Sequence, residues 1–91
     1  MTVKVESFTG TANGTAFMVS EDFDYSLSGT FVATVELQRT FDGGTTWRPA
    51  KTALTAAAEG FCEHRGAPAQ YRFACTAFTS GTAKAQANIQ D

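Results

Sequence analysis

The sequence has few of the residues that carry chemistry in enzymes and metal sites. The 91-residue chain contains one histidine and two cysteines. Two cysteines cannot form the disulfide framework of a small secreted domain. One histidine with two cysteines also lacks the paired ligand spacing of a zinc site. We therefore expect no metal and no cofactor.

Charge and long apolar runs are also scarce. Charged residues make up 18% of the chain and the formal net charge is -2, whereas an average soluble chain is roughly 25% charged. The absence of any Lys or Arg run argues against a nucleic-acid partner. No apolar run reaches the roughly 20 residues that cross a bilayer, so no membrane partner is expected. Met1 is followed by Thr-Val-Lys-Val-Glu, without the basic and apolar regions of a signal peptide. We expect a chain kept inside a cell, or assembled there into something released later.

The abundant residues favour strands and turns. Hydrophobic residues make up 43% of the chain, enough for a core, and eight of them are Phe. Much of the polar remainder is Thr, Ser, Gly, Asn and Gln, which suit strands and the turns between them. No stretch has the composition of a linker, so residues 1–91 are predicted to form a single domain.

Alternation of apolar and polar side chains indicates where the strands lie. The predicted strands cover residues 2–8, 15–19, 23–28, 30–40, 71–78 and 83–89, with a returning strand from Trp47. Residues 53–59 are interpreted as a strand end and loop, and residues 65–68 and 79–81 as turns. Seven or eight short strands at this spacing predict an all-β fold, either an antiparallel β-sandwich or a jelly-roll-like small barrel.

The inward faces of these strands supply the predicted core, which consists of Val3, Val5, Phe31, Val35, Leu37, Trp47, Tyr71, Phe73 and Ile89. Residues 59–64 and 69–76 are expected to pair as a hairpin. That register separates Cys62 from Cys75 by roughly 13 Å, at about 3.3 Å per residue. A disulfide needs Cα atoms within roughly 7 Å, so both cysteines are expected to be free thiols. The alternative is a loop at residues 59–64 that folds back and lets Cys62 approach Cys75.

One local motif is well defined. Residues 40–47 follow the pattern Thr40-x-Asp42-x-Gly44-x-Thr46-Trp47, which resembles the Asp-box of sialidases and related propellers. The resemblance implies a structural hairpin, away from any chemistry, made by Thr40, Asp42, Gly43, Gly44, Thr46 and Trp47. In such a turn the carboxylate accepts from backbone N–H groups, glycine takes the strained angle and Trp packs onto the core. A propeller needs at least four blades of about 40 residues, which this chain cannot hold.

The remaining candidates for catalysis are sparse. His64 lies between Glu63 and Arg65, and Cys62 is two residues away. A nucleophile and base would also need an acid that orients the base. We expect His64 to be a solvated loop histidine, and we predict no catalytic residue and no enzyme activity.

Two charged clusters are interpreted as structural. Glu21, Asp22 and Asp24 lack the ligand spacing of a calcium loop and suggest a solvated corner. Positive charge is concentrated at Arg39, Arg48, Lys51 and Arg72. Arg39 and Arg48 flank the predicted hairpin, and cross-strand charge pairing is preferred there to a phosphate or sugar-acid site.

Two longer segments carry a second resemblance. Residues 25–47, YSLSGTFVATVELQRTFDGGTTW, and residues 69–82, AQYRFACTAFTSGT, are similar to small all-β structural proteins of tailed bacteriophages. The resemblance implies a virion structural protein, assembled in the host cytoplasm. The role it favours is a capsid decoration or cement protein that binds the major capsid protein, or another virion protein, on the outer head shell and stabilises it. It also implies a homo-oligomer, with a trimer at three-fold positions as the usual geometry.

The alternative function is a carbohydrate-binding module, or a fibre or connector module of the phage particle. A sugar site requires aromatic side chains on one face or loop, and Trp47, Tyr25 and Phe41 are the candidates. Open sheet edges with few Lys or Pro residues also predict self-association. Residues 2–8 and 82–89 are the expected contacts.

Overall fold

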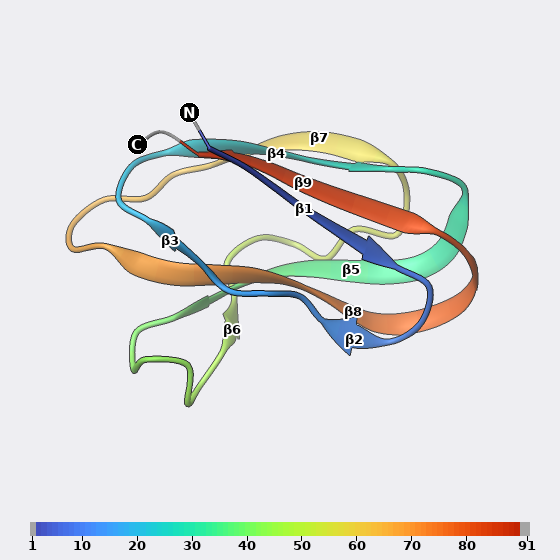
Figure 1. Ribbon diagram of the computed structural model, residues 1–91, viewed down its shortest axis with the longest axis horizontal. Helices are drawn as coiled ribbons and strands as arrows, with labels where there is room; N and C mark the ends of the chain where they lie inside the picture. The colour runs from blue at the N-terminus through green and yellow to red at the C-terminus, as the bar shows by residue number, and fades with distance from the viewer. Residues whose placement is uncertain (1, 90–91) are drawn as a thin grey trace.

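The computed structural model describes residues 2–89, which form nine β-strands and no helix. The strands are β1 (Thr2–Phe8), β2 (Ala12–Asn13), β3 (Phe17–Val19), β4 (Phe23–Ser28), β5 (Phe31–Thr40), β6 (Arg48–Pro49), β7 (Ala58–Cys62), β8 (Ala69–Gly81) and β9 (Ala83–Ile89). They pack as two antiparallel sheets, one above the other in Figure 1. The first sheet has the order β1-β9-β4-β7, and the second has the order β2-β8-β5-β6, with β3 also paired to β8.

The strand pairs are nested about the middle of the chain. The first strand β1 pairs with the last strand β9, β2 and β3 pair with β8, β4 pairs with β7, and β5 pairs with β6. The chain is therefore one long hairpin, bent at residues 41–47 and rolled into two sheets, which is the arrangement of a jelly roll. The prediction of an all-β antiparallel sandwich is confirmed, and its strand order is that of a jelly roll.

The core fills the space between the sheets from alternating positions along each strand. On β5, Ala33, Val35 and Leu37 point inward and are 8%, 2% and 4% exposed. On β9 the small side chains of Ala83, Ala85 and Ala87 are fully buried, which lets the facing layer approach closely. Five members of the predicted core are confirmed as buried: Val35, Leu37, Tyr71, Phe73 and Ile89.

The predicted inward face of the first strand is wrong. Val3 and Val5 are 45% and 47% exposed, whereas Phe8 is only 2% exposed. Because side chains alternate across a strand, the buried Phe8 places the even-numbered positions inward and both valines outward. Phe31 and Trp47, also predicted as core residues, are only partly buried.

Two predicted connections are also wrong. Residues 59–64 and 69–76 do not form a hairpin, because Cys62 lies opposite Phe23 in the first sheet and Cys75 lies opposite Val35 in the second. The two cysteines are nevertheless free thiols, as expected. Residues 79–81 continue β8 instead of turning.

The C-terminal strand is not an open edge, since β9 is paired with β1 on one side and β4 on the other.

Candidate functional site

The turn between β5 and β6 is held by side chains of the Asp-box-like motif. The hydroxyl of Thr40 donates to Oδ1 of Asp42 at 2.8 Å and accepts from the N–H of Gly44 at 3.0 Å. Oδ1 of Asp42 also accepts from the N–H of Thr46 at 2.8 Å, which confirms the predicted bond between this carboxylate and the turn. Nε1 of Trp47 donates to the carbonyl of Gly44 at 3.1 Å. These bonds tie the whole turn to the end of β5.

Charge and backbone angles fit the same structural role. The N–H of Thr46, followed by the hydroxyl of Thr40, lowers the pKa of Asp42 to about 2. The carboxylate therefore remains a charged acceptor at neutral pH. Gly43 and Gly44 have φ angles of 75° and 101°, which glycine adopts without steric cost.

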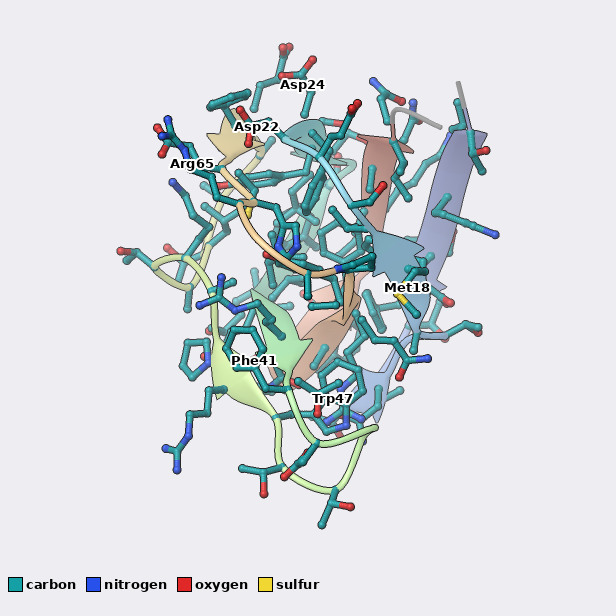
Figure 2. All side chains as sticks on the ribbon, turned by 90° about the vertical axis from the view of Figure 1, so that its left-hand side faces the viewer. Met18, Asp22, Asp24, Phe41, Trp47 and Arg65 are labelled. Carbon is teal, nitrogen blue, oxygen red and sulfur yellow. The ribbon has the colours of Figure 1, made fainter. Side chains whose placement is uncertain are left out.

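This rigid turn presents Phe41 to solvent at one end of the sandwich. The Phe41 side chain is 78% exposed. Figure 2 looks onto this end, where Met18, Trp47 and Arg65 are also labelled. Phe41 lines two grooves, one shared with Met18, Arg65 and Pro68 and the other shared with Arg39, Arg48 and Pro49. We name this surface the Phe41 end, and it consists of Met18, Arg39, Phe41, Arg48, Arg65 and Pro68.

Three arginines, Arg39, Arg48 and Arg65, give the Phe41 end its positive charge. Arg39 lies directly opposite Arg48 in the register of β5 and β6. The Arg39 guanidinium sits 4.7 Å from the centre of the Phe41 ring, and its Nη1 donates to the Tyr71 hydroxyl at 3.3 Å. Like charges placed opposite one another destabilise a strand pair, so the expected cross-strand charge pairing does not explain their position. The chemistry of this surface suits an acidic and partly apolar partner.

His64 is a structural residue, not the solvated loop histidine that was expected. Its side chain is only 5% exposed. Nε2 lies 2.8 Å from the carbonyl of Ala67, which can only accept, so Nε2 carries the proton. Nδ1 lies 2.9 Å from the Tyr71 hydroxyl and accepts from it. With both ring nitrogens hydrogen-bonded inside the protein, His64 joins the 63–68 loop to β8.

The two thiols are also held in structural positions. Cys62 and Cys75 are 2% and 3% exposed. Burial raises the pKa of both thiols, which disfavours the reactive thiolate. Burial likewise raises the pKa of Tyr71, against the opposing effect of Arg39. None of these groups has the properties of an activated nucleophile.

The other candidate residues are not gathered into a site. Oδ1 of Asp22 accepts the backbone N–H of His64 at 2.8 Å, so this member of the acidic cluster fixes a loop. Within residues 2–89, no group of three or more His, Cys, Asp and Glu side chains is placed to hold a metal ion. Of the aromatic candidates, Tyr25 is buried, and the Arg72 guanidinium lies 4.3 Å from the centre of the Trp47 ring. Phe41 is the openly exposed ring among the three.

Part of the Phe41 end could not be anticipated from the sequence. Met18, Arg65 and Pro68 were not singled out, because residues separated by this much sequence come together only through the strand pairing. Phe41 carried a weak signal, since it is an aromatic residue placed where a strand ends and a turn begins.

The described part of the chain, residues 2–89, has no helix of the length and apolarity needed to span a membrane. Comparison with protein-family models, curated proteins and solved structures finds no match to this chain.

Proposed function

We propose that this chain is a non-catalytic structural protein of a tailed-bacteriophage particle, assembled in the host cytoplasm. Its role is that of a decoration or cement protein that binds the outer head shell and stabilises it. The likeness of residues 25–47 and 69–82 to phage structural proteins supports a place in the virion. The exposed side chains of the Phe41 end support binding to the shell through this surface.

The observation that carries this proposal is the exposure of Phe41 on a rigid turn. Phe41 is 78% exposed, and Met18, which lines the same groove, is 57% exposed. Exposed apolar side chains that gather at one place and are rimmed by polar residues mark interaction sites. The hydrogen bonds of Thr40 and Asp42 fix the turn before binding, so little conformational entropy is lost when a partner docks. Aromatic, methionine and arginine side chains are enriched in protein interfaces.

The chemistry of the Phe41 end also supports a choice of partner. Arg39 and Arg48 lie side by side, and Arg39 is held in place by Tyr71 and Phe41. We propose that the major capsid protein, or another shell protein, presents carboxylates to these arginines and an apolar pocket to Phe41. The jelly roll is found among both viral capsid and lectin domains, so the fold alone does not choose between the two roles.

The proposal is tested on heads of the phage that encodes the chain, prepared without it. Purified chain is added back and the bound copies are counted after sedimentation. Wild-type chain should bind in hundreds of copies per head, and Phe41→Ala should weaken binding at least about 10-fold, as loss of an interface anchor does. Val32→Ala is the matched control, because Val32 is 58% exposed on another part of the surface and should leave binding unchanged.

Three results would count against this proposal. Equal binding by the wild type and Phe41→Ala would show that the Phe41 end is not the docking surface. A few dozen copies or fewer per purified particle would favour a connector or fibre module over a decoration protein. Absence of the chain from purified particles would remove the virion role altogether.

A further inference from the structure

The four sheet edges of this sandwich are not equally protected. In the second sheet, β6 has two residues and includes Pro49, and the opposite edge is divided between β2, of two residues, and β3, of three. In the first sheet, β7 has five residues and includes Gly60. Short strands, breaks, proline and charged side chains are devices by which natural sheets avoid pairing with other chains.

The remaining edge, β1, has no break and no proline, and its two charged residues, Lys4 and Glu6, are of opposite sign. It has seven residues, Thr2–Phe8, without Gly or Pro, and its pairing with β9 runs through all seven without a register shift. Its other side is an edge of the first sheet. A long, regular edge strand presents a row of backbone donors and acceptors that another strand can use.

We propose that this edge pairs with β1 of a second copy of the same chain, antiparallel, about a two-fold axis at Val5. In this register Val5 lies opposite Val5 of the partner subunit. Lys4 then lies opposite Glu6 of the partner subunit, and Glu6 lies opposite Lys4 of the partner subunit. An antiparallel strand pair gains from opposite charges placed directly across from each other. The order Lys4-Val5-Glu6 is thus complementary to itself, and this complementarity selects a second copy as the occupant.

The outer face of β1 fits the same pairing. Val3 and Val5 are 45% and 47% exposed on this face. The two-fold register brings the two Val5 side chains together and places Val3 beside Ser7 of the partner subunit, so each valine loses contact with water. On the opposite face of β1, Glu6 is held in place, because its Oε1 accepts the N–H of Thr15, in the segment between β2 and β3, at 2.7 Å. Its second oxygen is the one that accepts from Lys4 of the partner subunit.

The result is a two-fold dimer in which the two first sheets join into one continuous sheet. Such an interface is isologous and closes on itself, unlike the head-to-tail contact that a trimer needs. This inference is independent of the virion role, because it rests on the edge strands and on the charges of β1 alone.

The register is tested by cysteine cross-linking under mild oxidation. Val5→Cys should give a disulfide-linked dimer in high yield, since the two-fold axis brings this position against itself within the Cα distance a disulfide requires. Val3→Cys should give less than about a tenth of that yield, because Val3 lies opposite Ser7. Adding Ser7→Cys to Val3→Cys should restore the dimer. The native thiols do not interfere, since both are buried.

Charge reversal provides a second measurement that does not depend on cysteine chemistry. In light scattering over a range of concentrations, Lys4→Glu should shift the wild-type dimer toward monomer, and adding Glu6→Lys should shift it back. Lys84→Glu is the matched control, because it makes the same change in charge on the centrally placed β9. A wild-type monomer at every concentration would overturn the inference. So would a dimer or trimer in which Val3→Cys cross-links as well as Val5→Cys.

Discussion

Asp42 links the protonation of one side chain to the stability of the central turn. Its pKa is lowered from 3.8 to about 2, mainly by the N–H of Thr46 and then by the hydroxyl of Thr40. A carboxyl with a lower pKa in the folded state stabilises folding above its unfolded pKa. That stabilisation is lost as pH falls from about 4 toward about 2.

The expected result for Asp42→Asn is a weaker dependence of folding stability on pH in this acidic window. The amide oxygen can still accept from Thr46, but it carries no charge to titrate. Urea unfolding of both proteins at neutral pH and in the acidic window measures the difference, and carbon NMR gives the carboxyl titration directly. A wild-type Asp42 that titrates at its ordinary value of 3.8 would contradict the prediction.

His64 makes a comparable contribution from inside the protein. His64→Leu removes the donor to the Ala67 carbonyl and the acceptor of the Tyr71 hydroxyl, and keeps an apolar side chain of similar bulk. Leaving a buried polar group without a partner costs about 1–3 kcal/mol, and we expect the free energy of unfolding to fall by this amount. Tyr71→Phe removes the hydroxyl instead, and a double-mutant cycle isolates the bond between the two side chains. Additive effects of the two substitutions would show that the bond contributes nothing.

The contrast between these two residues shows what the sequence can reveal at this scale. Asp42 was predictable because its hydrogen bonds run to residues within four positions of it. His64 was misinterpreted because its ring partner Tyr71 belongs to another strand, and a neighbouring Glu63 and Arg65 suggested a solvated loop. Burial of a loop residue depends on what the rest of the chain packs against it.

At the scale of strands and turns, two glycines with similar backbone angles have different surroundings. Gly66 and Gly81 have φ angles of 90° and 89°. A Cβ on Gly66 would meet no atom within 4 Å, whereas a Cβ on Gly81 would press against the carbonyl oxygen of Thr30 and lie 2.7 Å from Cα of Phe31. Gly81 lies where the ends of β8 and β5 pair closely.

We therefore expect Gly66→Ala to cost about 1–2 kcal/mol of stability from the positive φ angle alone. Gly81→Ala carries the same strain and a backbone clash in addition, so its cost should be clearly larger. Thermal or urea unfolding of the two variants makes the comparison. Equal destabilisation would mean that the contact between Gly81 and Thr30 is looser than described.

The positions of the strands along the chain were predictable, but the buried face of an edge strand was not. Alternation in residues 31–40 predicted the inward face of β5, because the large apolar side chains of Val35 and Leu37 lie on the same face. In β1 the alternation favoured Val3 and Val5, yet one large ring, Phe8, on the opposite parity decided the face. An edge strand can leave valines exposed, and no local pattern distinguishes an edge strand from a central one.

At the scale of the whole molecule, the order of the strands in the two sheets could not be predicted from the sequence. The turn at residues 65–68 suits a hairpin, but here the chain crosses from β7 in one sheet to β8 in the other. Local turn chemistry reports a change of direction and does not report which sheet the chain enters next. The same limit explains why the residues of the Phe41 end could not be grouped in advance.

The crossing leads to a prediction about the two thiols. Cys62 and Cys75 are buried in different sheets, and burial raises the pKa of each. A thiol reagent at neutral pH should label neither residue in the folded protein, and both should react together at the rate of global unfolding. Mass spectrometry over time follows the two sites separately. Rapid labelling of one thiol alone would indicate local opening of its sheet.

The nested strand order also sets the timing of folding during synthesis. Among the strands of residues 2–89, β9 is made last, yet it lies in the first sheet between β1 and β4. A ribosome delivers the N-terminal segments first, so β1 leaves the exit tunnel long before its partner exists. In a nascent chain that stops before residue 83, β9 is missing, so β1 and β4 have no strand between them in the first sheet. The first sheet can therefore be completed only after β9 has been made.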